Sequence, residues 1–479
     1  MRTKTHRIVC IVCMLVYTLA LYSISATDSL YKAQCDSLNI PILYIVTENG
    51  VMPTYTVVYA PEGCSGRGIT NNEPVPAHMW IILEGDTLLD TGDFVKGSSG
   101  VTIKVRGNTT ASDNSLKKPY KLKLQTKADL LFRGNEAVYA DKDWVLLRDH
   151  LCATMVGNMT NRALGMKWTP AQTPVFLFLN DHFQGLYMLT ENVKRNTKCR
   201  VDVDKTGFLY EFDAYWWNED FHIDSHEFGP RINYTLKYPD SEDILPWQGD
   251  YLTNHINKVE NAFITSDALD SAIDIHSYAR WLWVHDMLGN SDGAGSNLFI
   301  AKNDTTALSK QEMICAWDFD GCFTPDIQWS EVHHHFWFRD FFTLPQKQFV
   351  QEYIDMYDSV VKDVFDQLVN DIHALRQTEQ IATLDSAFVM DGKRWDSQHS
   401  ANKQLEDIAN YLTHRKHVVE NMMVDLKDNY IFTTLPEDTY RNTYGTSTYD
   451  VLGRPVPENS NGLIMIRRNS DGSVQKLMR

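Results

Sequence analysis

Regular alternation of apolar and polar residues dominates the first part of the chain and predicts β-strands. It is seen in five segments, at residues 42–46, 55–59, 78–89, 101–105 and 119–124, as expected where successive side chains point to opposite faces of a strand. Two apolar runs, 175–179 and 186–189, are joined by a short polar link and predict a β-hairpin. Residues 149–165 are expected to form a helix between these strands.

Helical periodicity replaces this alternation after about residue 270. Asp274 is placed to cap a helix whose apolar residues recur, as far as Leu288, at the spacing of one buried face. Two long amphipathic segments, 348–375 and 402–427, show the clearest helical pattern in the chain. The second part of the protein is therefore expected to be mainly helical.

These elements divide the chain into parts of different character. A strand-rich lobe with a linker is expected first and a helix-rich lobe second, which is an α+β, two-lobed architecture. The tail carries apolar runs around Val451 and Ile464 that predict a small strand–turn–strand unit. The expected parts are a signal peptide over 1–26, an N-terminal lobe over 27–270, a C-terminal lobe over 271–428 and a tail over 429–479.

The first residues have the features of a secretory signal. Arg2, Lys4 and Arg7 precede an apolar run over residues 8–22, and Ala26 is a suitable cleavage position. The run is shorter than the ~20 residues of a membrane span, although an uncleaved anchor is the alternative. No later segment is long and apolar enough to span a bilayer. The protein is therefore expected to be exported, to the periplasm, the cell surface or the medium.

Composition and charge restrict the classes of function. Of the 479 residues, 43% are hydrophobic and 22% are charged, which excludes a wholly disordered, collagen-like or coiled-coil protein. The 45 Lys and Arg residues and the 62 Asp and Glu residues give a formal net charge of −17. An acidic surface repels phosphate backbones, which argues against a nucleic-acid binder but leaves room for a local basic pocket.

The cysteines are compatible with an oxidising compartment. Two of the eight, Cys10 and Cys13, lie in the expected signal and leave six, which could form up to three disulfides. The mature chain contains no C-x-x-C pair, so a thiolate zinc site is not expected.

The segment from Gly289 to Asn297 contains the first candidate chemistry. Asp292 is followed five residues later by Asn297, at the end of a predicted buried helix. A phosphotransferase loop needs this pair, because the Asp orients the attacking hydroxyl and the Asn side-chain oxygen holds a divalent ion. A plain loop is the alternative, since these residue types are common in turns.

An acidic pair follows the next apolar run. Residues 313–317 predict a strand that ends in Asp318-Phe319-Asp320-Gly321. Carboxylates two residues apart share one face of a strand and suit a hard cation such as Mg²⁺. The structural alternative is a strand that ends in a capping Asp, with the second Asp starting a turn. The order of the two motifs, Asp-x4-Asn and then Asp-x-Asp-Gly, supports the catalytic interpretation about equally.

A cluster of cations lies in the strand-rich half. Lys117, Lys121 and Lys123 are expected on one face of a strand, and Arg106 precedes a predicted turn at Gly107. Several cations on one face of an acidic protein predict an anion site, for which polyphosphate is a good ligand. A solvated strand face is the alternative.

With these blocks in order over about residues 40–425, the chain resembles the CotH kinase family, the spore-coat-type atypical protein kinases. The matching motifs are Arg106-Gly107-Asn108-Thr109, Lys117-Lys118-Pro119-Tyr120-Lys121, Trp144-Val145-Leu146-Leu147, the hairpin from Asn180 to Glu191, Asp292…Asn297 and Trp317-Asp318-Phe319-Asp320. The tail resembles the C-terminal tails of exported Bacteroidetes proteins, some of which are sorting domains, and a plain terminal hairpin is the alternative.

The resemblance implies a two-lobed, atypical protein-kinase-like fold that binds ATP with Mg²⁺ or Mn²⁺ and phosphorylates Ser or Thr of an extracytoplasmic protein. Glu191 falls where a hinge between the lobes would support the nucleotide. The resemblance assigns Asp292 as the catalytic residue, Asn297, Asp318 and Asp320 as metal ligands, and Arg106, Lys117, Lys121 and Glu191 as residues of the nucleotide site.

One motif departs from the family pattern. The family usually has an Arg-Asn pair in the helix after Leu-Leu, whereas this chain has Gly157-Asn158. The alternative function is therefore a catalytically silent CotH-like surface module that binds carbohydrate or an envelope protein. A nucleotidyl or sugar-phosphate transferase is a further alternative, because similar metal machinery serves other acceptors.

Overall fold

A computed structural model describes most of the chain between residues 26 and 433, together with three short strands of the tail. The described residues are 26–64, 69–71, 73–226, 232–265, 269–293, 296–334, 347–433, 447–450, 464–468 and 474–478. The expected signal peptide therefore lies, apart from Ala26, outside the described residues. The chain divides into two compact units, Met1–Glu420 and Asn421–Arg479.

The first unit is built around a closed barrel of β-strands. The hydrogen-bonded order is β1-β9-β10-β8-β7-β6-β4-β5, and a further pairing of β1 with β4 closes the barrel and leaves β5 at its edge. The strands are β1 (Ile42–Thr47), β4 (Val75–Leu83), β5 (Asp86–Asp90), β6 (Val101–Val105), β7 (Tyr120–Ala128), β8 (Asp141–Leu147), β9 (Gln172–Leu179) and β10 (His182–Glu191). They confirm the hairpin and most of the strands predicted from alternation.

The barrel interior is filled by the alternating apolar residues of its strands. Ile103, Leu122, Trp144 and Leu177 belong to one buried cluster inside it. Their neighbours along each strand point outward, as strand geometry requires. The predicted segment at 55–59 forms a separate two-stranded ribbon, in which β2 (Thr56–Val58) pairs with β3 (Ile69–Asn71).

A second, antiparallel sheet includes the region expected to be a linker. Its order is β12-β13-β11-β14-β15. The strands are β11 (Phe208–Asp213), β12 (His222–Ile223), β13 (Asn233–Tyr238), β14 (Leu298–Lys302) and β15 (Gln311–Ala316). Every residue of β11 and β14 is buried, so these strands lack the alternation that reveals a half-exposed strand.

Helix α6 (Pro246–Thr265) packs on this second sheet. The ring of its Tyr251 stacks on Phe208 of β11 at a centroid distance of 5.9 Å. Its buried Glu260 accepts a hydrogen bond of 2.8 Å from the hydroxyl of Tyr234 on β13. One face of the sheet is therefore covered along the helix.

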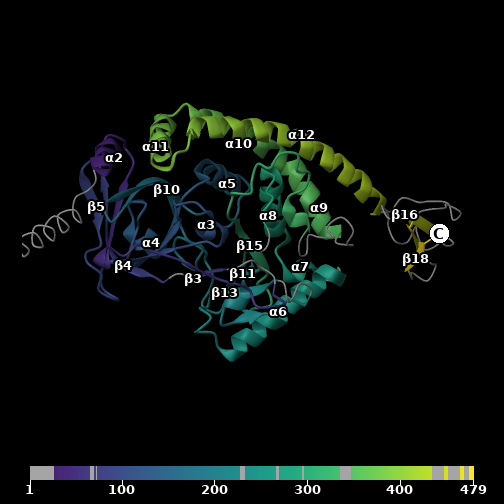
Figure 1. Cartoon of the computed structure of the whole chain (residues 1–479). Helices are drawn as coiled ribbons and strands as arrows, with labels where there is room; N and C mark the ends of the chain where they lie inside the picture. Colours follow the sequence, from purple (N-terminus) through teal and green to yellow (C-terminus); the bar gives the residue numbers. More distant parts are fainter. Residues whose placement is uncertain are drawn as a thin grey trace, which may run out of the picture. The chain divides into compact units, whose positions relative to one another are not determined.

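The remaining long helices join the two sheets (Figure 1). Helix α8 packs on β15 and α9, α5 on α8 and α10, and α11 on β10. They are α5 (Leu151–Ala163), α8 (Ile275–Leu288), α9 (Lys347–Met356), α10 (Lys362–Arg376), α11 (Glu379–Trp395) and α12 (Ala401–Thr433), beside the shorter α2 (Ala26–Asp36), α3 (Thr109–Ser112), α4 (Glu136–Tyr139) and α7 (Leu269–Ala272).

The helical predictions are confirmed in their main features. Asp274 caps α8, because its carboxylate accepts a hydrogen bond from the backbone N–H of Ser277. A π-helical turn, Tyr357–Val361, interrupts the first of the two long predicted segments, and the second is α12. The architecture is thus α+β, with a strand-rich N-terminal half and a mainly helical C-terminal half.

The tail unit contains a three-stranded antiparallel sheet in the order β16-β17-β18. Its strands are β16 (Ser447–Asp450), β17 (Ile464–Arg468) and β18 (Val474–Met478). The apolar run around Ile464 predicted β17, whereas the run around Val451 lies, beyond Asp450, outside the described residues. The sequence did not predict β18.

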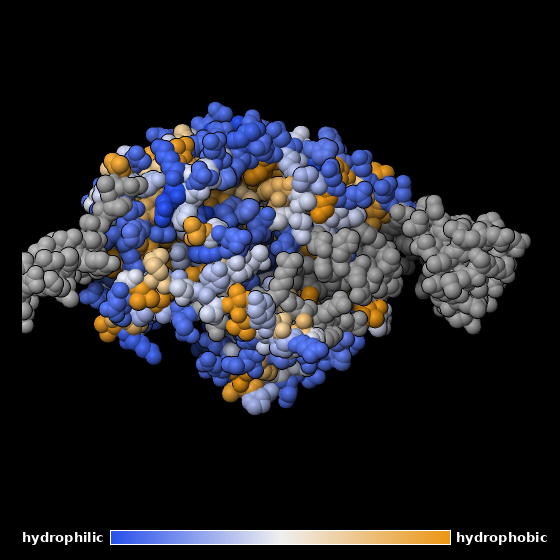
Figure 2. Space-filling view, viewed as in Figure 1, coloured by the Kyte–Doolittle hydropathy of each residue, from blue (hydrophilic) through white to orange (hydrophobic). Residues whose placement is uncertain are grey.

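The cysteines and the surface complete this description. All six cysteines beyond the expected signal are free thiols, and a unit with an extensive apolar core has little need of cross-links. No helix among the described residues is both long and apolar enough to cross a membrane. On the face shown in Figure 2, hydrophilic residues predominate and hydrophobic ones are scattered.

Candidate active site

The two acidic motifs are joined by hydrogen bonds. The backbone N–H and the hydroxyl of Ser291 both donate to the carbonyl oxygen of Gly321, at 2.9 and 3.0 Å. A Cβ atom at Gly321 would lie 2.8 Å from the Cβ of Asp292. The loop after α8 therefore lies directly against the Asp318–Gly321 turn, as the ordered motifs suggested.

Four carboxylates and one guanidinium gather at this junction. Burial raises the pKa of Asp318 well above its usual range, the negative charges of Asp320, Asp292 and Asp149 raise it further, and Arg106 lowers it. The Asp318 side chain is open to solvent, although protein surrounds it on most sides. We call this group of charged residues around the exposed Asp318 the cleft.

Arg106 reaches the cleft from the end of β6. Gly107 turns the chain with a φ of +80°, and Asp113, after α3, accepts a hydrogen bond of 3.0 Å from Nη1 of Arg148. These contacts fix the loop that follows Arg106. The guanidinium interacts electrostatically with Asp318 and with Glu211 of β11, which places it between the barrel and the second sheet.

A row of lysines lines the outer face of the barrel. Lys104 of β6 pairs in register with Lys121 of β7, and Leu122 points into the core. The Nζ atom of Lys121 lies 3.9 Å from Oδ1 of Asp143. Burial lowers the pKa of Lys121, Asp143 opposes this shift, and the charges of Lys104 and Lys237 lower the pKa further. Lys237, on β13 of the second sheet, therefore lies close to the barrel lysines.

The second sheet presents charges to the same cleft. Nζ of Lys237 lies 2.8 Å from Oε2 of Glu211. Burial raises the pKa of Glu211 to about 7, with Lys237 acting against the shift and Asp213 adding to it. Oδ1 of Asp213 accepts a hydrogen bond of 3.3 Å from the hydroxyl of Ser296. Asn297 comes next, directly before β14, so the predicted metal-binding amide lies beside this sheet.

Sequence reasoning missed Glu211, Asp213 and Lys237. The signal was present as charged residues two apart in apolar surroundings, at Glu211-Phe212-Asp213 and at Thr235-Leu236-Lys237. Such spacing puts side chains on one face of a strand. The region was not recognised as strands, and the charges were therefore not considered as part of a site.

Lys117 has a different environment from Lys121. It lies before the first residue of β7, and its ammonium donates hydrogen bonds of 2.7 Å to Oδ1 of Asp391 and to the carbonyl oxygen of Leu186. Lys117 and Asp391 are each 10% exposed. The ion pair ties the segment before β7 to α11, and Leu186 joins β10 to both residues.

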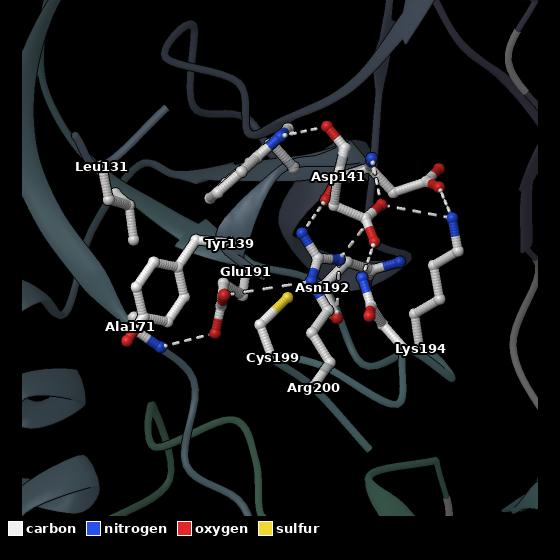
Figure 3. A network of polar contacts seen from close by, with 12 residues as sticks. Leu131, Tyr139, Asp141, Ala171, Glu191, Asn192, Lys194, Cys199 and Arg200 are labelled. Atoms are coloured by element: carbon white, nitrogen blue, oxygen red, sulfur yellow. Dashed lines mark hydrogen bonds and ion pairs between the residues drawn. The ribbon is translucent and has the colours of Figure 1, made fainter. Parts of the chain in front are cut away.

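Glu191 is bound into the wall of the barrel (Figure 3). Its Oε1 accepts a hydrogen bond of 2.9 Å from Nη1 of Arg133, and its Oε2 accepts one of 3.0 Å from the backbone N–H of Ala171. The side chain is 1% exposed. It belongs to a network that continues through Arg200 to Asp141 of β8. Both carboxylate oxygens are thus engaged by the protein.

A buried carboxylate fixes the end of α8, from which the Asp292 loop emerges. Asp286 accepts hydrogen bonds from the backbone N–H and hydroxyl of Ser330, from Nε2 of His333 at 2.8 Å and from the hydroxyl of Tyr353 at 2.7 Å. Nε of Arg415 donates to the Asp286 carbonyl oxygen at 2.8 Å. Burial would raise the pKa of Asp286, but His333 and Ser330 outweigh it and lower the pKa to about 2.

Gly157 shows how the structure accommodates the departure from the family pattern. A Cβ atom at this position of α5 would overlap the ring of Phe319. The aromatic residue between Asp318 and Asp320 therefore packs where the Arg side chain of the family pattern would begin.

The donor set of the cleft fits a divalent cation. Carboxylate and amide oxygens are the ligands preferred by Mg²⁺ and similar ions, and Asp318, Asp320 and Asn297 supply them. Among the described residues, no three His, Cys, Asp or Glu side chains are already gathered within reach of one ion. The repulsion around Asp318 is the observation that favours a cation, because a bound ion would cancel it.

Comparison with known families agrees with this arrangement. Residues 103–419 match a family model described as CotH kinase protein, which covers most of the chain and all of the cleft residues described above. No curated protein matches the chain.

Proposed function

This chain belongs to the CotH kinase family, and from that premise we propose that it is an ATP-dependent protein kinase that phosphorylates Ser or Thr residues of a protein outside the cytoplasm. The observation that carries the proposal is the junction of the Asp292 loop with the Asp318–Gly321 turn, where Arg106 interacts electrostatically with Asp318. Positioning and electrostatic stabilisation are the main requirements of phosphoryl transfer.

Each cleft residue has a role in this proposal. Asp292 orients the acceptor hydroxyl and takes its proton. Asn297, Asp318 and Asp320 hold Mg²⁺ or Mn²⁺. Bound ATP supplies the phosphoryl group. The barrel and the second sheet with its helices correspond to the two lobes of a kinase-like fold, with the cleft between them.

Location outside the cytoplasm rests on the signal-like first 26 residues. Under the proposal these residues direct export to the periplasm, the cell surface or the medium. The resemblance of residues 429–479 to tails of exported Bacteroidetes proteins supports a sorting role for the tail.

A thermal-stability measurement tests the nucleotide site. ATP with Mn²⁺ or Mg²⁺ should raise the melting temperature of the mature protein, since a ligand that binds only the folded state stabilises it. Asp318→Ala should abolish the rise. Asp371→Ala, at an exposed position of α10, removes the same charge away from the cleft and should keep it.

A transfer assay then separates the kinase from the alternative functions. Asp292→Asn should lower phosphoryl transfer to protein by about 10²–10⁴-fold while the ATP-dependent shift remains. Absence of any shift at millimolar ATP, with all variants folded, would instead favour a silent binding module. ATP binding with transfer to a sugar or of a nucleotidyl group would redirect the proposal to those acceptors.

A further inference from the structure

The second sheet contains a β-bulge at the point where Lys237 enters the cleft. Leu209 of β11 pairs with Tyr238 of β13, whereas Tyr210 pairs with Leu236. Lys237 is therefore the extra residue of the bulged strand. Bulges often lie beside active sites, where they redirect a side chain. Here the redirected ammonium meets Glu211, 2.8 Å away.

The ammonium of Lys237 is held but accessible. Its side chain is 31% exposed, whereas that of Glu211 is 8% exposed, so the cation rather than the carboxylate faces the cleft. Glu211 is the ion-pair partner found for Lys237 among the described residues. Because an ammonium carries three N–H donors, Lys237 retains donors for an anion in the cleft.

Cations of both sheets meet around this pair. Lys237 affects the charge state of Lys121 on the barrel, and so does Lys104. Burial lowers the pKa of Arg106, which also belongs to the barrel part of the chain, and the negative charge of Glu211 raises it. Glu211 thus forms an ion pair with a cation of its own sheet and interacts electrostatically with a cation from the barrel. These cations repel one another, and the carboxylates of Glu211 and Asp143 offset part of the repulsion. An anion of high charge bound between the cations would offset more of it.

We propose that Lys237 is a phosphate-binding residue of the nucleotide site and that Glu211, 2.8 Å away, is the positioning residue that orients it. The proposal rests on the proposed kinase function, which it deepens. The family resemblance assigned the phosphate contact to Lys117 or Lys121. The present proposal assigns it instead to Lys237, a lysine of the second sheet. Lys117 is unsuited to that contact because Asp391 and the Leu186 carbonyl hold its ammonium.

The test uses tripolyphosphate, ATP and adenosine as probes of the mature protein, each with Mn²⁺, and measures affinity by calorimetry. Lys237→Met should weaken tripolyphosphate and ATP binding by about 10- to 100-fold, the value of one charge-assisted contact, and leave adenosine binding unchanged. Lys237→Arg should recover part of the loss. Lys258→Met, on the exposed surface of α6, is the matched control and should bind as the wild type does.

Glu211→Gln tests the positioning role. It should weaken ATP binding by about two- to tenfold. The double variant Lys237→Met/Glu211→Gln should bind ATP no more weakly than Lys237→Met does, rather than showing the product of two independent losses. Equal melting temperatures for Glu211→Gln and the wild type would show that the loss is not one of folding.

The outcomes separate this inference from the function on which it rests. Unchanged tripolyphosphate affinity in Lys237→Met, or an equal loss of adenosine affinity, would overturn the phosphate contact. Tripolyphosphate binding that depends on Lys237, without any transfer to protein, would support the contact and refute the kinase. A wild-type protein that binds neither ATP nor tripolyphosphate would refute both.

Discussion

Replacing Lys117 by Met should destabilise the protein without weakening phosphate binding. The Lys117 ammonium donates to Asp391 and to the Leu186 carbonyl at 2.7 Å, and both charged side chains are 10% exposed. Removal of the cation leaves Asp391 buried with the backbone N–H of Leu186 as a remaining donor, at 2.8 Å. Breaking one side of a buried ion pair costs about 3–5 kcal/mol.

This cost corresponds to a measurable change in melting temperature. At about 2.1 cal/mol/K per residue, a unit of roughly 400 residues unfolds with an entropy of about 0.8 kcal/mol/K. The melting temperature of Lys117→Met should therefore fall by about 4–6 °C. Calorimetry of the wild type and the variant, with the tripolyphosphate titration on both, provides the assay.

A double variant isolates the ion pair itself. Lys117→Met/Asp391→Leu removes both charges, so its loss should be smaller than the sum of the two single losses, with a coupling of about 1–3 kcal/mol. A melting temperature of Lys117→Met within about 1 °C of the wild type, together with a large loss of tripolyphosphate affinity, would refute the reasoning. Lys117 would then be a phosphate contact, as the family resemblance allows.

Three further predictions follow from particular contacts. Gly157→Arg should cost about 1–3 kcal/mol or more because its Cβ overlaps the ring of Phe319, and adding Phe319→Ala should restore part of the melting temperature; no recovery would contradict the overlap. Asp286→Asn should lower the free energy of unfolding by about 3–5 kcal/mol in denaturant titrations. An unchanged unfolding midpoint would contradict the inference that the hydrogen bonds of Asp286 stabilise this part of the fold. Burial opposes the shift, but Arg200 and neighbouring donors lower the pKa of Asp141 to about 2. A carboxyl group whose pKa is lowered by folding stabilises the folded state at pH values above its ordinary pKa, and this stabilisation is lost as the pH falls towards 2. Asp141→Asn should therefore weaken the pH dependence of the free energy of unfolding between about pH 5 and 2. Identical unfolding profiles of the variant and the wild type in acid would refute this.

Alternation predicted the barrel strands that are partly exposed on one side, although it did not predict that the strands close into a barrel. β6 alternates buried and half-exposed residues throughout, and the same alternation marks β7 up to Leu124. Alternation did not reveal the second sheet, although the apolar run at 313–317 correctly predicted its strand β15. Its β11 and β14 are buried on both faces, and a short apolar run does not distinguish such a strand from part of a helix.

The same physical difference divides the candidate site. Asp292 and Asp318 could be found because each belongs to a short motif whose spacing is carried by the local chain. Lys237 could not, since its approach to Glu211 depends on a bulge in the pairing of two strands. Alternation placed Lys117 with Lys121 on one strand face, but β7 begins at Tyr120. Lys117 lies before the strand and turns towards Asp391 instead.

The absence of the family Arg at Gly157 is not by itself evidence for a silent module. Phe319 fills the space at that position, so the positive charge near Asp318 and Asp320 does not come from α5. It comes from Arg106 at the end of β6, and Lys237 adds a second cation at the opposite wall. Because these cations belong to different sheets and Glu211 interacts electrostatically with both, the proposed phosphate site should depend on how the barrel and the second sheet are held together. A variant that loosens this contact should therefore lose nucleotide binding before it loses the fold of either sheet.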